Sequence, residues 1–443
     1  MNEIQIGLLI VVVTTAVLFS GFPIAWGLAL VSVAFLVVFK GPSSLQIIAT
    51  QFMDELNSFA LLTIPLFVLL GASIGVTAAG KDIYESMYRW LARLPGGLVI
   101  ANILACGMFA AVCGSSPATA AAIGKAGVPE MIRRGVPPAL ATGAICAGGT
   151  LGILIPPSIT MILYGIATET SIGRLFLAGV VPGALLVLLF AVYAWAATLL
   201  ANRAGLAAGG AGTVEERFTL RQKSEGLVRV GPFLLLLVAI GYFMYGGLAT
   251  PSEIAAIGAF LALILVYTIY GAWRPSDQWL VFRDTVRESS MILMIIAAAA
   301  LFSYMMSLLY VSQTAAEWLV ALQLNRWVLM LLINVFMLVL GCFLPPVAII
   351  LMLMPILSPV LEANNFDLIW FAVILTINME VGLITPPVGL NLYVLRGVAP
   401  QVSLPTILRG SMPFVLIMLA FLVLMSFFPQ IATWLPDKLM GPG

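Results

Sequence analysis

Long apolar runs separated by short polar segments dominate this chain. Ten of the runs have the length of one membrane crossing, because a spanning helix needs about 20 mostly apolar residues. They lie at about residues 4–20, 24–39, 58–77, 138–166, 175–200, 231–247, 254–271, 289–310, 368–395 and 410–428. The pattern therefore predicts an all-α polytopic membrane protein.

Two further apolar stretches, 97–132 and 327–363, are each too long for one simple crossing. Each is interrupted in its middle, at 114–117 (Gly-Ser-Ser-Pro) and at 341–346 (Gly-Cys-Phe-Leu-Pro-Pro). Glycine and proline together break a helix and free its backbone groups. Each stretch is therefore either a pair of spans or a re-entrant hairpin that returns to the side it entered from.

The distribution of basic residues favours the hairpins. With both stretches treated as hairpins, fifteen of the twenty basic residues fall on one side of the membrane and four on the other, while Lys125 lies inside the first hairpin. Positively charged loops stay in the cytoplasm, so the side with fifteen is predicted to be cytoplasmic. This arrangement predicts that both termini lie outside, on the side opposite the cytoplasm.

Composition narrows the class of function. Of the 443 residues, 62% are hydrophobic and only 9% are charged, whereas soluble domains carry roughly 25% charged residues. A soluble enzyme, a disordered chain and a nucleic-acid binder are excluded. The chain has no histidine, the commonest metal ligand and proton shuttle, and no GxxxxGK[ST] phosphate loop. An ion gradient remains as the source of energy.

An ordered series of motifs recurs after about 230 residues. Gly152-Ile-Leu-Ile-Pro-Pro157 matches Gly382-Leu-Ile-Thr-Pro-Pro387, and a Leu-Tyr pair follows each. We predict a first repeat over 1–201, a cytoplasmic connector over 202–230 and a second repeat over 231–443. Each repeat holds five crossings and one hairpin. One of the five crossings is a broken helix, at 138–166 in the first repeat and at 368–395 in the second. Because five is odd, the second repeat is predicted to be inverted relative to the first.

Three polar segments carry charges at helical spacing. For residues 40–57 and 78–95 we predict amphipathic helices along the membrane surface, with ordinary loops as the alternative. Residues 272–288 are the predicted counterpart in the second half.

The helix breaks are the predicted location of ligand binding. A broken helix exposes carbonyls at one half-helix end and amides at the other, which suit a desolvated Na⁺ and a carboxylate respectively. Hydroxyl and amide side chains accompany the breaks, namely Ser115, Ser116, Thr119, Ser158, Thr160, Thr385, Asn378 and Asn391. The alternative is that the breaks are tight contacts between small residues of neighbouring helices.

Three charged residues fall within apolar stretches: Lys125, Glu130 and Glu380. Glu130 is followed by Arg133 and Arg134, so it is predicted to pair with them where the hairpin ends. Glu380 lies one turn before the second break, where it would orient that break or carry a proton for coupling.

At these residues the sequence resembles a known family, the large membrane subunits (DctM-like) of the tripartite ATP-independent periplasmic (TRAP) transporters. The resemblance covers essentially the whole chain. It rests on residues 57–71 with Ile-Pro-Leu-Phe at 64–67, and on 114–124, 152–158, 164–165, 182–183, 341, 355–356 and 382–393.

The resemblance implies an elevator-type transporter of a bacterial inner membrane rather than an enzyme. The outside of that membrane is the periplasm, so both termini are predicted to be periplasmic. Such subunits import organic acids, often carboxylates or sulfonates, coupled to Na⁺, and need no other cofactor. They work with a small four-helix membrane subunit and a soluble periplasmic binding protein. Residue by residue, the resemblance implies Na⁺ ligands at Gly114, Ser115, Ser116, Gly152 and Pro156, and at Gly341, Cys342, Leu344, Gly382 and Thr385. It implies substrate contacts at Ser116, Thr119, Pro157, Ser158, Pro387 and Asn391.

The chain departs from the family pattern at one position. Many members carry an acidic residue where this chain has Pro345, so the second Na⁺ site would depend more on backbone carbonyls or on Glu380. Two alternatives stay open: a stand-alone Na⁺/dicarboxylate symporter of related architecture, and a channel or membrane scaffold.

Overall fold

The computed structural model describes residues 2–203, 218–246, 248–321 and 325–441. About half of the predicted connector, residues 204–217, lies outside them. The described residues form α-helices and three short 3₁₀ segments, without any β-strand among them. The predicted all-α class is confirmed.

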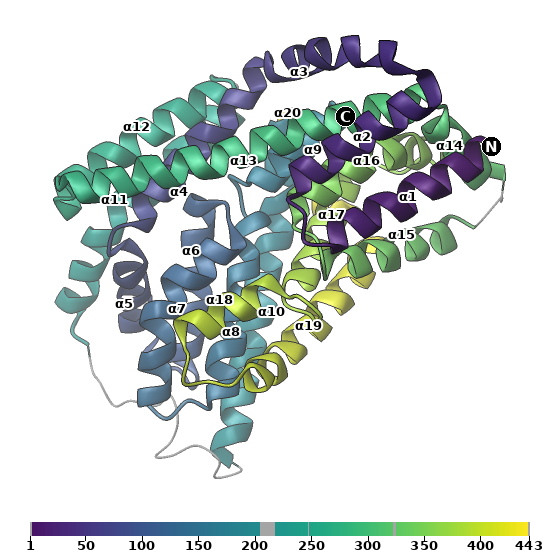
Figure 1. The fold of residues 1–443 in the computed structure, drawn as a ribbon. Helices are drawn as coiled ribbons and strands as arrows, with labels where there is room; N and C mark the ends of the chain where they lie inside the picture. The colour runs from purple at the N-terminus through teal and green to yellow at the C-terminus, as the bar shows by residue number, and fades with distance from the viewer. Residues whose placement is uncertain (1, 204–217, 247, 322–324, 442–443) are drawn as a thin grey trace.

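The first half contains ten α-helices and the three 3₁₀ segments (Figure 1). In chain order they are α1 (Glu3–Phe19), α2 (Ile24–Lys40), η1 (Pro42–Ile47), α3 (Ile48–Leu56), η2 (Phe59–Leu62), α4 (Thr63–Gly75), α5 (Ala79–Leu91), α6 (Gly97–Cys113), α7 (Ser116–Arg133), α8 (Pro138–Thr150), η3 (Leu151–Ile153), α9 (Ile159–Ala167) and α10 (Ile172–Arg203).

In the described part of the second half there are ten more α-helices. They are α11 (Leu220–Tyr245), α12 (Pro251–Tyr270), α13 (Pro275–Leu308), α14 (Val311–Ala321), α15 (Arg326–Gly341), α16 (Pro346–Ala363), α17 (Leu368–Leu383), α18 (Leu390–Val398), α19 (Leu404–Phe427) and α20 (Gln430–Met440).

Six of the described helices are long and apolar enough to cross a membrane by themselves: α10, α11, α12, α13, α16 and α19. Shorter apolar helices occupy most of the other predicted crossings, including α1, α2, α8 and α17. The predicted crossing at 58–77 is instead divided into η2 and α4, and this pair is bent by 61° from the preceding η1–α3 pair.

Two helices extend further than the apolar pattern indicated. The segment 272–288 is not a separate surface helix, because α13 continues without a break from Pro275 to Leu308. α11 begins at Leu220, inside the predicted connector 202–230, where Thr219 caps it by accepting a hydrogen bond from the Gln222 amide. Two helices that the apolar pattern did not indicate, α14 and α20, follow α13 and α19.

Small residues let the central helices approach closely. A Cβ atom at Gly143 of α8 would lie 2.8 Å from the Cα atom of Gly410 on α19, so the two backbones touch there. Such contacts between small residues are a common means of packing membrane helices. Around this crossing, α8 also packs against α6, α7 and α10, while α17 packs against α15, α10 and α19.

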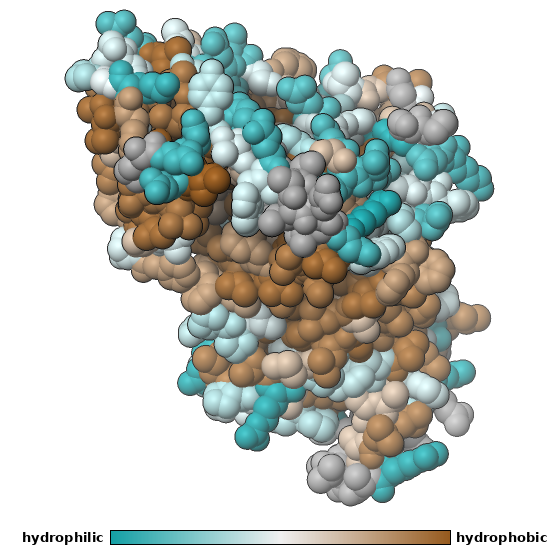
Figure 2. Space-filling model, turned by 90° about the vertical axis from the view of Figure 1, so that its right-hand side faces the viewer, coloured by the Kyte–Doolittle hydropathy of each residue, from teal (hydrophilic) through white to brown (hydrophobic). Residues whose placement is uncertain are grey.

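The surface agrees with a membrane environment. Figure 2 shows a broad hydrophobic belt across one face, with hydrophilic residues above and below it. Many large apolar side chains are exposed, such as Leu8 on α1, Leu331 on α15 and Leu235 on α11. In water an exposed apolar area of this extent would be a liability, whereas against lipid it is the expected surface.

Candidate functional site

All four predicted helix breaks are present. The first hairpin stretch is interrupted at 114–115, between α6 and α7, and the second at 342–345, between α15 and α16. The two GxxxPP motifs end η3 and α17, and the helix resumes at α9 and α18. The peptide bond between the two prolines is cis in both motifs.

The first hairpin tip lies directly against the first broken helix. A Cβ atom at Gly152 would be 2.7 Å from the carbonyl carbon of Ser115, and one at Gly114 would be 2.9 Å from the carbonyl oxygen of Pro157. Gly114 itself has φ of +63°, a left-handed conformation that glycine adopts without strain. The structure therefore brings the candidate Na⁺ ligands of the tip together with those of the break.

The second tip repeats this arrangement. A Cβ atom at Gly382 would be 2.7 Å from the Cα atom of Gly341, so the backbones of α17 and the tip are in contact. The Val388 amide donates a hydrogen bond to the Cys342 carbonyl (3.2 Å), and Cys342 Sγ lies 3.1 Å from the Thr385 hydroxyl. Four of the five candidate Na⁺ ligands of the second site are therefore in mutual contact, namely Gly341, Cys342, Gly382 and Thr385. The fifth, Leu344, lies beside them in the tip.

Each tip contains one helix end of each kind. α6 and α15 end at the tips, and α7 and α16 begin there with amides that have no partner within their helix. The carbonyl end is partially negative and suits a cation, and the amide end suits an anion. Prolines at the second residue of α7 and the first residue of α16 are compatible with a helix start.

The candidate substrate hydroxyls are buried and oriented by the backbone. Ser116 Oγ donates to the Thr150 carbonyl (3.1 Å), and Thr119 Oγ1 donates to the Ser115 carbonyl (2.9 Å). Ser158 caps α9 by accepting from the Met161 amide (3.3 Å). These hydroxyls therefore gather around the first tip and the first break.

The remaining substrate candidates belong to the second break and are less closely joined to this group. Asn391 is fully buried and reaches from α18 to α8, where its Nδ2 donates to the Cys146 carbonyl (3.4 Å). Its Oδ1 has no partner among the described residues. Pro387 is exposed, whereas Pro157, its counterpart in the first break, is buried.

An apolar cavity of about 290 Å³ lies beside the first break. Pro156 and Pro157 form one wall, and side chains of α10 and α11, among them Ile240 and Tyr245, form others. None of the candidate hydroxyls lines this cavity. The cavity therefore adjoins the first break on a side away from the hydroxyl group.

Glu380 is fully buried in α17. Neither of its carboxyl oxygens has a hydrogen-bond partner among the described residues. Because a helix turns 100° per residue, Glu380 points away from the face that Asn378 and Gly382 present to the second hairpin. Glu380 is therefore not a direct neighbour of that tip.

Two asparagines in the hairpin arms were missed in the sequence. Asn334 on α15 accepts a hydrogen bond from Asn378 Nδ2 on α17 through its side-chain oxygen (2.8 Å), which ties the second hairpin to the broken helix. Asn102 on α6 is fully buried, close to Gly127 on α7. Each is an isolated amide in an otherwise apolar run. That pattern could have indicated both residues, because polar side chains within membrane segments usually have a partner.

The chemistry of the donor set fits Na⁺ better than a transition metal. Within the described residues no group of three His, Cys, Asp or Glu side chains could hold a metal ion. What the tips offer is carbonyl and hydroxyl oxygen. The broken helix of the second half adds two acceptors without a partner among the described residues, Asn378 Oδ1 on α17 and Asn391 Oδ1 on α18. At Pro345 no side-chain ligand exists, and its carbonyl already accepts from the Ala348 amide (3.1 Å).

Similarity to known proteins extends over nearly the whole chain. The profile of the family described as "Tripartite ATP-independent periplasmic transporter, DctM component" matches residues 11–431. The C4-dicarboxylate TRAP transporter large permease protein DctM of Pseudomonas aeruginosa is 36% identical over 406 residues, covering 92% of this chain and 93% of that protein. The sialic acid TRAP transporter large permease protein SiaM of Vibrio cholerae is 29% identical, covering 96% and 97%.

A third relative is longer than this chain. The isethionate TRAP transporter permease protein DctMQ of Oleidesulfovibrio alaskensis is 31% identical, covering 93% of this chain and 63% of that protein. Among solved structures, the YdaH transporter of Alcanivorax borkumensis superposes with a TM-score of 0.61 at 17% identity, covering 92% of this chain and 91% of that one. MtrF of Neisseria gonorrhoeae gives a TM-score of 0.54 at 14% identity, covering 90% and 85%. These two share the fold.

Proposed function

Because the chain belongs to the DctM family of the tripartite ATP-independent periplasmic transporters, it is a large permease subunit for organic acids, and we propose that it couples their import to Na⁺. The observation that carries the proposal is the docking of each hairpin tip onto its own broken helix, at Gly152 and at Gly382. Each contact combines backbone carbonyls with a hydroxyl, the ligands that suit a desolvated alkali cation.

The proposed substrate is a small organic anion, a carboxylate or a sulfonate. The names of the relatives include C4-dicarboxylate, sialic acid and isethionate transporters. The start of α7, with Ser116 and Thr119, supports an anion site there, because helix N-termini favour negative charge. We propose that Ser158 and Asn391 complete it from the first and second halves.

We further propose that the two hairpins and two broken helices move together, as in an elevator mechanism. Reciprocal packing between the halves supports this: α9 of the first half packs on α16, and α18 of the second half packs on α7. The order hairpin, broken helix, long helix occurs in both halves, as α6–α10 and as α15–α19, which is what an inverted repeat would produce.

In this proposal the second Na⁺ site differs from the first because Pro345 supplies no carboxylate. Thr385 and the carbonyls of the tip would hold the ion, and Glu380 would orient the broken helix from its other face.

The proposed partners are a small four-helix membrane subunit and a periplasmic binding protein. The proposed location is the bacterial inner membrane, with both termini periplasmic.

Reconstitution tests the proposed function. Proteoliposomes that contain this chain and the small subunit, supplied with the binding protein, are expected to accumulate succinate or another bound organic acid under an inward Na⁺ gradient. A K⁺ gradient of the same size is the control and is expected to drive no accumulation. Uptake without the binding protein would favour the stand-alone symporter, and single-channel currents would favour a channel.

Labelling tests the hairpin topology. In a variant with Cys342→Ser, cysteines introduced at Ser115 and Phe343 are expected to react from opposite sides of the membrane, because the two hairpins are predicted to enter from opposite faces. Both positions are partly exposed at the tips. Modification by a membrane-impermeant maleimide, added outside or inside oriented vesicles, measures this. Labelling of both cysteines from one side only would contradict the hairpin prediction.

A further inference from the structure

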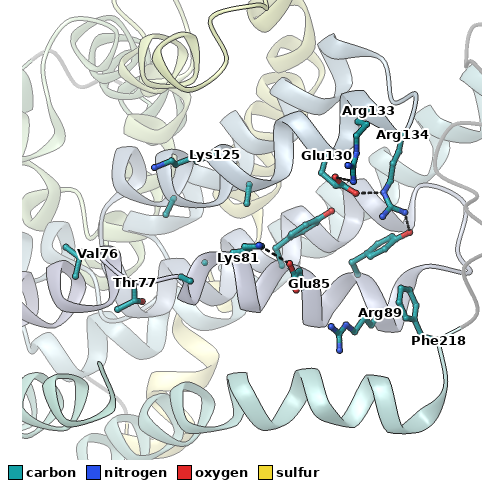
Figure 3. A pocket seen from close by; sticks show the side chains of 17 residues that line it. Val76, Thr77, Lys81, Glu85, Arg89, Lys125, Glu130, Arg133, Arg134 and Phe218 are labelled. Carbon is teal, nitrogen blue, oxygen red and sulfur yellow. Dashed lines mark hydrogen bonds and ion pairs between the residues drawn. The ribbon is translucent and has the colours of Figure 1, made fainter. Parts of the chain in front are cut away.

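A cavity of about 830 Å³ lies between α5 and α7, with the turn after α4 and Phe218 completing its walls (Figure 3). None of the candidate Na⁺ or substrate residues lines it. Its volume is in the range of small-ligand sites. Its lining is strongly charged, and the basic members are Lys81, Arg89, Lys125, Arg133 and Arg134.

Positive charge exceeds negative charge in this lining. Glu85 and Glu130 are the acidic members, so five cations and two anions leave an excess of three positive charges. Glu130 is already bound by Arg133 and Arg134, each at 2.5 Å, and Lys81 lies 3.6 Å from Glu85. Both acidic side chains of the described lining are therefore paired already, and neither remains for Arg89 or Lys125.

Among the described residues, Lys125 and Arg89 are the cations of the lining that have no acid partner. Lys125 is exposed and has no hydrogen bond or ion pair with any described residue, and Figure 3 shows its amino group well away from Glu130. Arg89 donates to the backbone carbonyl of Gln222 (2.8 Å) and pairs with no carboxylate of the described residues. Lys125 extends from α7 and Arg89 from α5, and Figure 3 shows them toward different ends of the cavity.

A contact between α5 and α7 holds the two walls of the cavity together. The residues around the cavity are of the types that gather at a membrane interface. Arg134 donates to the Tyr88 hydroxyl (2.6 Å) and stacks on its ring, which ties the end of α7 to α5. Trp90, on the same helix, is 48% exposed and lies under the Lys223 amino group at 5.2 Å. Tryptophans and basic residues gather at the level of lipid headgroups.

We propose that this cavity binds the headgroup of an anionic phospholipid, with Lys125 and Arg89 as the cations available to its phosphate oxygens. The required chemistry is a multiply charged oxyanion, which inorganic phosphate shares. The lipid is favoured because basic pockets at the interface bind such headgroups and because the apolar side chains of Val76 and Trp90 are exposed near the charged wall. A bound lipid would bridge α5 and α7. The proposal does not depend on Na⁺ coupling.

Native mass spectrometry of the purified full chain tests the proposal. The chain is titrated with cardiolipin or with phosphatidylcholine, and inorganic phosphate is added as a soluble competitor in a separate arm. Cardiolipin is expected to bind preferentially. The double variant Arg89→Gln/Lys125→Gln is expected to weaken cardiolipin binding roughly 25-fold, about fivefold for each basic residue lost near the headgroup. Phosphatidylcholine binding should not change.

Two further variants separate a specific site from general charge. Arg221→Gln/Arg283→Gln removes two exposed basic residues that do not line the cavity, and its cardiolipin binding should equal that of the wild type. Glu85→Gln raises the positive excess and is expected to tighten binding, a gain that misfolding cannot produce. Equal weakening by both double variants, equal binding of the two lipids, or retention of phosphate without cardiolipin would each overturn the proposal.

Discussion

Gly382→Ala is expected to reduce Na⁺-driven uptake at least tenfold and to lower the melting temperature of the purified chain. The added Cβ would lie 2.7 Å from the Cα atom of Gly341, where only backbone is available to move. Overpacking of this kind costs about 1–3 kcal/mol, enough to separate the second tip from its broken helix. Gly152→Ala is expected to do the same at the first tip, because its Cβ would be 2.7 Å from the Ser115 carbonyl carbon.

Two other helical glycines provide matched controls. Gly397 on α18 and Gly75 on α4 have no heavy atom within 4 Å of a built Cβ, apart from their own helix. Alanine at either position is expected to leave uptake intact and to stabilise the chain slightly, by about 0.4–1 kcal/mol, through the unfolded state. Proteoliposome uptake and thermal unfolding measure both effects. Normal uptake by Gly382→Ala would contradict the tip contact as a functional element.

Thr385→Val is expected to raise the Na⁺ concentration for half-maximal uptake roughly tenfold while folding is preserved. Valine keeps the shape of threonine but removes the hydroxyl that contacts Cys342 Sγ at the second tip. Losing one oxygen ligand or hydrogen bond in a buried site costs about 1–3 kcal/mol. Because the effect is on ion binding, uptake at saturating Na⁺ should fall much less. Ser115→Ala is expected to act in the same direction at the first tip.

The control for this substitution is Thr268→Val. Thr268 lies on α12, and its hydroxyl donates to the carbonyl four residues earlier, as Thr385 does. It is exposed and far from the hairpins in the sequence. Thr385→Ser should restore Na⁺ affinity, since it restores the hydroxyl. A Na⁺ dependence that stays unchanged in both Thr385→Val and Ser115→Ala would refute the assignment of the ion sites.

Local chemistry explains why the helix breaks could be predicted from the sequence. Glycine and proline act on the backbone of their own segment, so 114–117 and 341–346 located the tips to within two residues. The GxxxPP motifs located the other two breaks for the same reason. The pairing of each tip with its own break followed from the resemblance to the family, and the close contacts at Gly152 and Gly382 agree with it.

Features that depend on contacts between distant segments could not be predicted. The bond between Asn334 and Asn378 joins two helices, and neither residue alone indicates its partner. The cationic cavity forms because α5 and α7 lie side by side, and the sequence placed its basic residues in two separate segments without indicating that they share a cavity. The continuity of α13 was missed because charges at helical spacing are equally compatible with a surface helix and with the extension of a crossing.

The unbroken α13 also restricts how deeply the protein can sit in the bilayer. A helix of 34 residues is about 51 Å long, whereas the hydrocarbon core is about 30 Å thick, so its charged first turns extend beyond the lipid tails. Arg283 and Arg287 on those turns would have to lose water before the helix could sink deeper. α13 packs against α2, α4 and α16 (Figure 1). Its own depth in the bilayer therefore determines the depth of these three helices.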